Sequence, residues 1–150
     1  MEYTHPKRKT KVVFVQLGSP SEPTTKALRK YLRKFLGDPR VIDINPWLWK
    51  IILNCFVLPF RPQKSAKLYA RIWDGENFPL ITNTRDFTKN VSKELKKIDP
   101  EGYVEVNHAF LLSPPYVNEV YDSWEEDLKK GVGATKLLVI PMFPQYSEST

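Results

Sequence analysis

Val12-Val13-Phe14-Val15-Gln16-Leu17 is a nearly unbroken apolar run that ends at Gly18, and it sets the architecture of the chain. Such a run is typical of a strand that is buried on both faces of a parallel sheet, because a half-exposed strand alternates apolar and polar residues. A turn-rich loop follows over residues 18–23, and apolar residues at helical spacing then predict a helix that is capped by Thr24 or Thr25 and runs to Leu36. Gly37 and Pro39 end this helix.

Strands and helices alternate along the rest of the chain. Residues 103–110 and 136–141 are predicted strands, residues 63–74, 79–97 and 116–130 are predicted helices, and residues 41–44 form a short extended segment. This alternation predicts the α/β class, with helices flanking a parallel sheet in three layers. Residues 1–11 are polar and basic, so we expect a flexible arm before one domain over residues 12–150.

The charge balance restricts the partners. The net charge is +6, which favours acidic partners such as propionates, phosphates or anionic lipid headgroups. No sequence signature of a DNA- or RNA-binding module accompanies this charge, so we expect no nucleic-acid partner. The single cysteine, Cys55, excludes an intramolecular disulfide and is expected to be a buried thiol because it lies in an apolar run. Because no secretory signal is found, we expect a cytoplasmic protein.

The segment after Pro46 is unusually apolar, from Trp47 to Leu58. It is too short to span a bilayer, which needs about 20 apolar residues. Two interpretations stay open. The segment is either a core helix, or an exposed lip that covers a flat hydrophobic ligand or touches a membrane.

Familiar catalytic patterns are missing from the sequence. The loop at Gly18 lacks the second glycine and the lysine of a phosphate-binding loop, and no serine nucleophile elbow or zinc-ligand spacing is found. His108 lies in a predicted strand, where a lone histidine is more often structural than a metal ligand. It is nevertheless the metal-ligand candidate of this chain. The residues alone therefore predict no complete catalytic set.

Several segments, in order along the chain, resemble the N-terminal half of the ferrochelatases. They are the strand and loop at residues 15–20, the helix and its stop at residues 31–41, and the segment Pro59-Phe60-Arg61-Pro62-Gln63-Lys64-Ser65-Ala66, followed by Phe78-Pro79-Leu80 and Pro141-Met142-Phe143-Pro144-Gln145-Tyr146-Ser147. The resemblance covers about residues 12–150. It implies a chelatase-like α/β fold.

The resemblance also implies a ligand, haem or protoporphyrin. It places residues 47–58 at the lip of a porphyrin cleft, with Trp47, Trp49, Ile52 and Phe56 as apolar contacts. A cleft for a flat macrocycle also needs cations for the propionates, and Arg40, Arg61 and Lys64 are the candidates. Pairing of Arg61 and Lys64 with nearby carboxylates is the equally weighted alternative.

Departures from the family pattern bear on activity. In this family the proton-accepting histidine and its glutamate partner lie in the second half, and Leu111-Leu112 stands where the resemblance implies an Arg-Tyr pair. Removing pyrrole protons needs a base near the ring centre. We therefore expect a haem- or porphyrin-binding protein that does not insert iron.

Two alternatives stay open beside this expectation. One is an active chelatase that works as a homodimer, with His108 or the second copy supplying the base. The other is a structural or partner-binding module that has no ligand. For a natural short chain we expect a homodimer, because a sheet edge and apolar helix faces would otherwise be uncovered, and peripheral membrane contact stays open.

Overall fold

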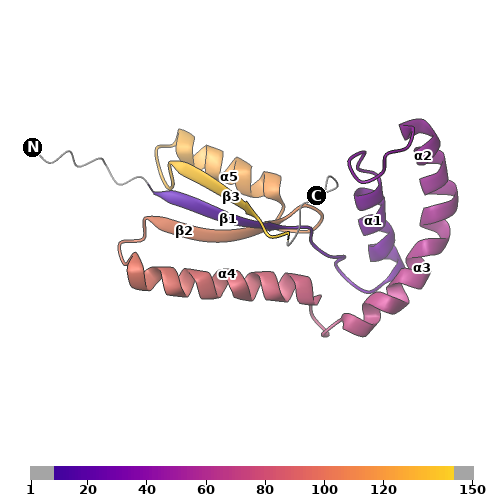
Figure 1. Ribbon diagram of the computed structural model, residues 1–150, viewed down its shortest axis with the longest axis horizontal. Helices are drawn as coiled ribbons and strands as arrows, with labels where there is room; N and C mark the ends of the chain where they lie inside the picture. The colour runs from indigo at the N-terminus through magenta and orange to yellow at the C-terminus, as the bar shows by residue number, and fades with distance from the viewer. Residues whose placement is uncertain (1–8, 144–150) are drawn as a thin grey trace, which may run out of the picture. The chain divides into compact units, whose positions relative to one another are not determined.

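Three strands form a parallel sheet in the computed structural model of this protein, which describes residues 9–143. They are β1 (Thr10–Gln16), β2 (Val104–Phe110) and β3 (Lys136–Pro141), in the order β2-β1-β3 (Figure 1). The central position of β1 accounts for its apolar run, because a strand with neighbours on both edges and helices on both faces has no solvent-facing side. Val12, Val13, Phe14 and Val15 are all buried.

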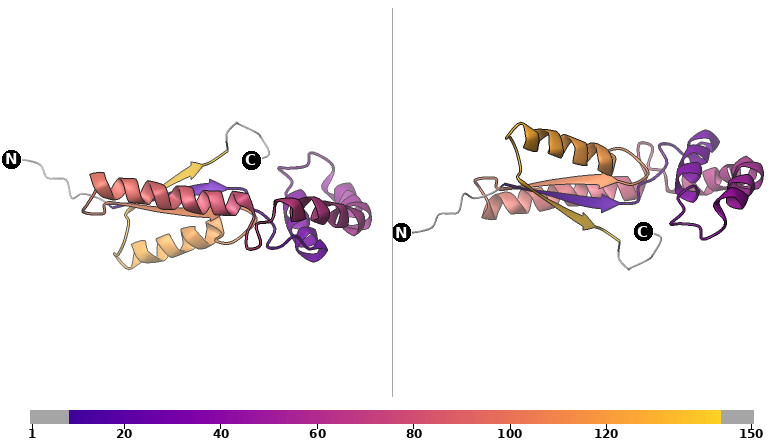
Figure 2. Two further views of the ribbon diagram at one scale, coloured as in Figure 1. Left: turned by 90° about the horizontal axis from the view of Figure 1, so that it is seen from below. Right: turned by 90° about the horizontal axis from the view of Figure 1, so that it is seen from above.

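One helix covers each face of this sheet. Helix α4 (Pro79–Ile98) lies along one face and α5 (Val117–Lys129) along the other (Figures 1 and 2). Successive side chains of β1 point alternately to the two faces of the sheet. The Phe14 ring meets the Phe87 ring of α4 edge-on, with 5.1 Å between their centroids, while Val13 and Val15 pack with Val117 and Val120 of α5. The predicted three-layer α/β fold is confirmed.

The described residues divide into two compact units. The first holds residues 9–16 and 83–142 and contains the sheet with most of α4 and all of α5. The second, which covers residues 17–82, contains α1 (Thr25–Leu36), α2 (Pro46–Ile52), the π-helix η1 (Leu53–Val57), α3 (Leu58–Tyr69) and the short 3-10 helix η2 (Ala70–Ile72). The sequence predicted one continuous domain. Most of the predicted basic arm lies outside the described residues, and Thr10 and Lys11 already belong to β1.

Helix α1 follows its sequence signals closely. The Thr24 side chain accepts a hydrogen bond from the Ala27 amide at 3.2 Å and so caps the N-terminus. Gly37 ends the helix, with its amide bonded to the Arg33 carbonyl at 3.0 Å. A Cβ atom at position 37 would lie 2.5 Å from that oxygen, so a side chain there requires a backbone shift.

Helix α3 begins at Leu58, five residues before the predicted start at Gln63, and it contains Pro62. Proline has no amide hydrogen, so Pro62 cannot bond to the Leu58 carbonyl as an ordinary helical residue would. The Arg29 side chain of α1 replaces the missing donor, since its Nε donates a hydrogen bond to the Leu58 carbonyl oxygen at 3.1 Å. A side chain from a neighbouring helix therefore allows the early start, which local sequence signals do not reveal.

Two further predictions are corrected. Residues 41–44 form no strand. Instead, the Val41 amide donates to the Asp38 backbone carbonyl and the Arg40 amide donates to the Asp38 side chain, and these bonds close a turn. Cys55 is exposed, so the expectation of a buried thiol is wrong. It belongs to η1, where Leu53 is the buried residue and the other side chains of the turn are at least partly open to solvent.

Candidate functional site

Five large apolar side chains are exposed to solvent along the continuous helical segment of α2, η1 and the start of α3. Trp47 is 75% exposed and Phe56 is 64% exposed. The set, which we call the apolar rim, is Trp47, Leu48, Ile51, Phe56 and Phe60. No residue of α2 is buried, and Ile52 is half-buried. This exposure favours the interpretation of the segment as a lip over that of a core helix.

Trp49 has a different position from Trp47 and Phe56. It is half-buried, and its indole Nε1 donates to the Leu36 carbonyl at the end of α1 at 2.6 Å. It also lines a pocket of about 730 Å³ together with Ile42, Ile44 and Leu53. Trp49 therefore anchors α2 to α1 and forms one wall of an apolar pocket.

The three candidate propionate-binding cations lie in two places. Arg61 and Lys64 are exposed and one turn apart on α3, and Lys64 is four residues from Phe60 of the apolar rim, on the same helix face. Neither forms an ion pair within the described residues 9–143, so the pairing with carboxylates that the sequence left open is not found there. Arg40 lies apart, in the turn after α1, beside a pocket that Arg33 also lines.

The buried phenol of Tyr31 joins α1 to the loop that precedes it. The Tyr31 hydroxyl donates to the Gly18 carbonyl at 3.3 Å, and Gly18 has the positive φ of 94° that its turn requires. Burial, and to a lesser extent the nearby Tyr69, raise the pKa of Tyr31 far above its ordinary value. Burial also raises the pKa of Tyr69. Both phenols are therefore neutral at physiological pH. The sequence signal for Tyr31 was its place on the apolar face of the predicted helix.

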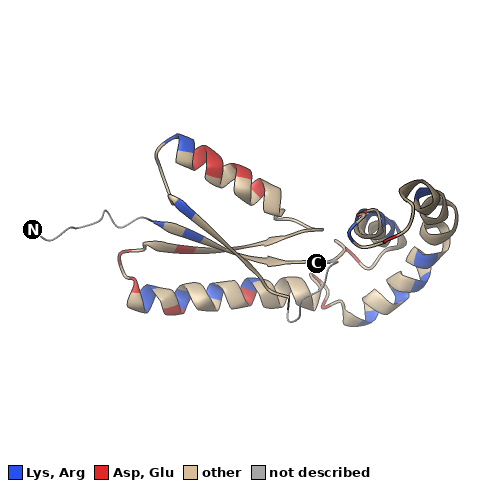
Figure 3. Ribbon diagram, turned by 45° about the horizontal axis from the view of Figure 1, so that its top comes forward, with Lys and Arg blue, Asp and Glu red and all other residues tan. Residues whose placement is uncertain are grey.

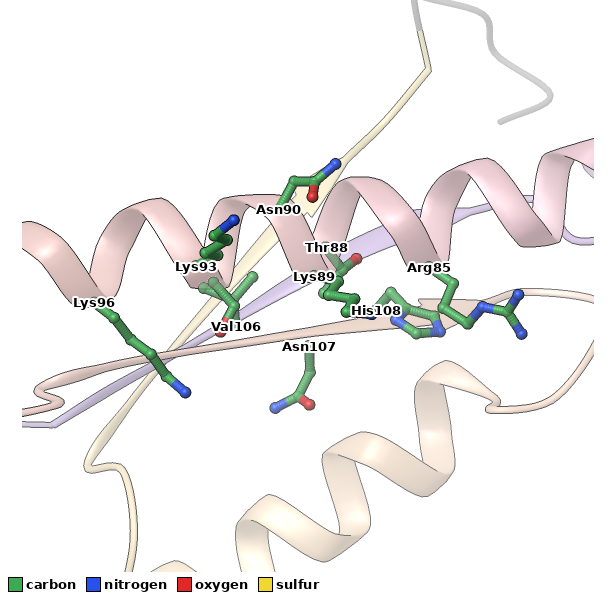
Figure 4. Close-up of a pocket in the computed structure, with 10 residues that line it drawn as sticks. Arg85, Thr88, Lys89, Asn90, Lys93, Lys96, Val106, Asn107 and His108 are labelled. Atoms are coloured by element: carbon green, nitrogen blue, oxygen red, sulfur yellow. The ribbon is translucent and has the colours of Figure 1, made fainter.

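His108 lies on the α4 side of β2, half-buried in a groove between the strand and the helix (Figure 4). Burial lowers the pKa of His108, and the neighbouring Arg85 guanidinium lowers it further. The described part of the chain contains no group of three or more His, Cys, Asp or Glu side chains that could hold a metal ion. Metal binding by His108 stays a prediction.

Leu111 and Leu112 follow β2 directly. The Leu111 amide donates to the Gln16 carbonyl at 3.0 Å, and the Gln16 side chain donates to the Met142 carbonyl at 3.0 Å. The end of β1 is thereby joined to the segments that follow β2 and β3. Gln16 therefore has a structural role at this end of the sheet. Leu111 is exposed and presents no charge or phenol.

Similarity to known proteins covers nearly the whole chain. The family model described as Ferrochelatase matches residues 9–150. A ferrochelatase from Idiomarina loihiensis is 41% identical over 139 residues, and one from Herminiimonas arsenicoxydans is 42% identical over 149 residues. A coproporphyrin III ferrochelatase from Streptococcus mutans is 41% identical over 143 residues.

The alignments cover nearly all of this chain but less than half of each relative. These alignments span 93% to 99% of this chain but only 36% to 43% of the relatives. The chain therefore spans about two fifths of the length of the curated relatives it matches. Within residues 9–143, no helix has the length and apolarity needed to cross a membrane.

Proposed function

This chain belongs to the ferrochelatase family, and on that premise we propose that it binds haem or a porphyrin at the apolar rim without inserting iron. The exposed rim is the observation that carries the proposal. Leaving a large apolar side chain in water forgoes roughly 1.5–3 kcal/mol of burial free energy, so several of them on one segment mark a binding surface.

The chemistry of the rim suits a tetrapyrrole. The macrocycle is flat and apolar, and Trp47, Phe56 and Phe60 offer aromatic surface to it. Its propionates need cations, and Arg61 and Lys64 lie beside the rim on α3 without a carboxylate partner among the described residues. The apolar rim and the neighbouring cations of α3 together support a ligand that has both an apolar surface and carboxylates.

The non-catalytic part of the proposal rests on the sequence. Leu111 and Leu112 stand where the family resemblance implies a cation and a phenol, and neither side chain can accept or donate a proton. His108 is the one histidine within residues 9–143, and burial beside Arg85 favours its neutral form. It is accordingly the residue to test for any remaining base function.

Ligand binding is tested by titrating the full chain with haem and with protoporphyrin while recording the Soret band. We expect saturable binding at micromolar ligand. The double variant Trp47→Ser/Phe56→Ser should weaken it about tenfold or more, since two apolar contacts are lost. Ile98→Ser is the matched control, because Ile98 is 80% exposed on α4 in the other unit. A wild-type chain that leaves both spectra unchanged would refute porphyrin binding.

The role of the cations is measured in the same assay. Arg61→Gln/Lys64→Gln should weaken binding of protoporphyrin while leaving binding of its dimethyl ester unchanged, because the ester has no carboxylates to pair. Equal losses for the acid and the ester would contradict propionate recognition.

Catalysis is tested separately by zinc insertion into protoporphyrin, followed by fluorescence. We expect no turnover from the wild-type chain. Turnover that disappears in His108→Ala would establish the alternative, an active chelatase that uses His108 as its base.

Self-association belongs to the same proposal. Strand β3 is an edge of the sheet within the described residues, and its Leu138 and Val139 are exposed on opposite faces. The exposure of these apolar side chains at a sheet edge supports a homodimer, in which a second copy would bury them. Peripheral membrane contact through the apolar rim is the competing use of that surface, and binding to vesicles that competes with haem would reveal it.

A further inference from the structure

A basic groove runs between α4 and β2 in the sheet unit. It has a volume of about 730 Å³, and Arg85, Lys89, Lys93 and Lys96 of α4 line it together with Val106 and His108 of β2 (Figure 4). None of its lining residues is acidic. Lysine and arginine outnumber aspartate and glutamate by five to two along α4, whereas acidic residues predominate on α5 (Figure 3).

The lysines of the groove have no carboxylate partner in the described part of the chain. Lys97 pairs with Glu94 at 2.7 Å, but no ion pair involves Lys89, Lys93 or Lys96. Arg85 has only a distant contact of 3.9 Å with the adjacent Asp86. The groove therefore presents a row of cations to an anionic occupant.

The strand beside this row has an open edge. Tyr103 accepts from the Thr10 amide and the Leu111 amide donates to Gln16, so odd-numbered residues of this strand direct their backbone groups toward β1. Backbone groups alternate along a parallel strand, so those of Val104, Val106, His108 and Phe110 point away from β1.

Two of these outward amides are already occupied. The Val104 amide donates to Asp99 Oδ2 at 2.7 Å, and the Phe110 amide donates to the Pro115 carbonyl at 2.8 Å. Within residues 9–143, the amides of Val106 and His108 have no hydrogen-bond acceptor, and their side chains line the groove. The middle of β2 therefore offers unpaired backbone donors directly beside the row of cations.

We infer that this groove binds an extended acidic peptide segment, with a carboxylate at every second residue, as an added strand on β2. Side chains two residues apart on a strand share a face and are about 6.6 Å apart. Cations four residues apart on α4 are about 6 Å apart, so Arg85, Lys89 and Lys93 match three alternate carboxylates. The row from Arg85 to Lys96 is about 16 Å long, which corresponds to about five strand residues.

A polypeptide fits these two features better than other polyanions. Nucleic acids and lipid headgroups can neutralise the lysines, but they cannot continue the backbone hydrogen bonding of a sheet edge. The inference does not depend on porphyrin binding, because all groove residues lie in the sheet unit and the apolar rim lies in the other unit.

The probe is a fluorescein-labelled, capped peptide, Glu-Thr-Glu-Val-Glu-Thr, added to the full chain and followed by fluorescence anisotropy. Saturable binding that weakens with added salt is expected. The control peptide, Thr-Glu-Glu-Glu-Val-Thr, has the same composition without the alternation and should bind about tenfold more weakly. Equal binding of the two peptides would overturn the proposed strand register.

Lys89→Glu/Lys93→Glu should weaken peptide binding about tenfold or more, because both residues are exposed and directly line the groove. Lys26→Glu/Lys30→Glu is the matched control, since these lysines are exposed, four residues apart on α1 and outside the groove. Unchanged thermal unfolding of both variants shows that folding is intact. Equal losses in the two variants would mean that only net charge matters, which would also overturn the proposal.

Two N-methylated forms of the peptide test the backbone pairing. Methyl groups on the three glutamate nitrogens block an antiparallel added strand, and methyl groups on the intervening nitrogens block a parallel one. One form should lose binding, and amide exchange of Val106 and His108 should slow when the unmodified peptide is bound. Full binding by both forms, or equally tight Lys89- and Lys93-dependent binding of single-stranded DNA or anionic vesicles, would overturn the peptide assignment.

Discussion

Single side chains join the segments of the second unit through hydrogen bonds to backbone carbonyls. Tyr31 donates to Gly18, Trp49 donates to Leu36 and Arg29 donates to Leu58, and each of these bonds joins separate segments. A buried or half-buried polar atom that lost such a partner would keep its desolvation cost, so these positions should be sensitive to substitution. By contrast, Trp47 and Phe56 are exposed, and replacing them should affect binding more than folding.

Tyr31 gives a prediction about pH. Its pKa is raised in the folded state, whereas the unfolded chain has the ordinary value of 10.0. The stability that this shift represents is present below pH 10 and is lost as the pH rises further, because only the unfolded state then releases the proton. Tyr31→Phe should therefore be less stable than wild type at pH 8, by about 1 kcal/mol, with a smaller deficit at pH 11.

Urea unfolding at the two pH values measures this difference. Tyr121→Phe serves as the control for loss of a phenol hydroxyl, since Tyr121 is 46% exposed on α5 in the other unit. A deficit for Tyr31→Phe that grows toward high pH would contradict the assigned burial of this phenol.

At the scale of elements, the continuous helical segment from Pro46 to Tyr69 shows how prolines are accommodated. The π-helix η1 precedes Pro59, and the Leu58 amide bonds back to Leu53 across the widened turn. Pro62 leaves the Leu58 carbonyl without its helical donor, and Arg29 supplies one from α1. The apolar rim is thus carried on a helix whose shape depends on its neighbour.

Arg29→Met should destabilise the chain by about 1–3 kcal/mol, because the Leu58 carbonyl lies at a buried residue and loses its donor. Pro62→Ala restores an amide that can bond to this oxygen, so Arg29→Met should cost less in a Pro62→Ala background. Urea unfolding of wild type, the two single variants and the double variant measures the coupling free energy between Arg29 and Pro62. Lys30→Met, at the next and exposed position of α1, should be nearly neutral. Additive effects of the two substitutions would show that the hydrogen bond does not stabilise the helix.

At the scale of the whole molecule, the sheet within residues 9–143 has two edges that differ in polarity, β2 and β3. The β2 edge borders lysines and carries two unpaired amides, whereas the β3 edge is apolar, with Leu138 and Val139 exposed. Apolar edges tend to be covered by other chains and charged edges resist nonspecific pairing. The two edges therefore suit different partners, a second copy at β3 and an acidic segment at β2.

For the homodimer, Leu138→Lys/Val139→Lys should convert a dimer into a monomer, because a lysine pair at a shared apolar edge is strongly unfavourable. Light scattering coupled to gel filtration gives the mass directly. Val132→Lys is the control, since Val132 is 54% exposed in a loop outside β3. A wild-type chain that is monomeric at high concentration would rule out the homodimer.

The amino-acid sequence alone determined the features that depend on local patterns. The apolar run from Val12 to Val15 predicted the buried central strand, and helical spacing, with a cap at Thr24 or Thr25 and a stop at Gly37, predicted α1. The ordered motifs also identified the family, which the match over residues 9–150 confirmed. These signals are readable because propensity, periodicity and capping act between residues a few positions apart.

Tertiary structure decided the features that depend on residues far apart in the chain. The early start of α3 needs Arg29, the exposure of Cys55 and Trp47 depends on which face of a helix packs, and the groove joins α4 lysines to the open edge of β2. The sequence pattern gave no sign that His108 would lie among these cations. Burial and pairing are properties of the assembled neighbours, so a local pattern cannot specify them.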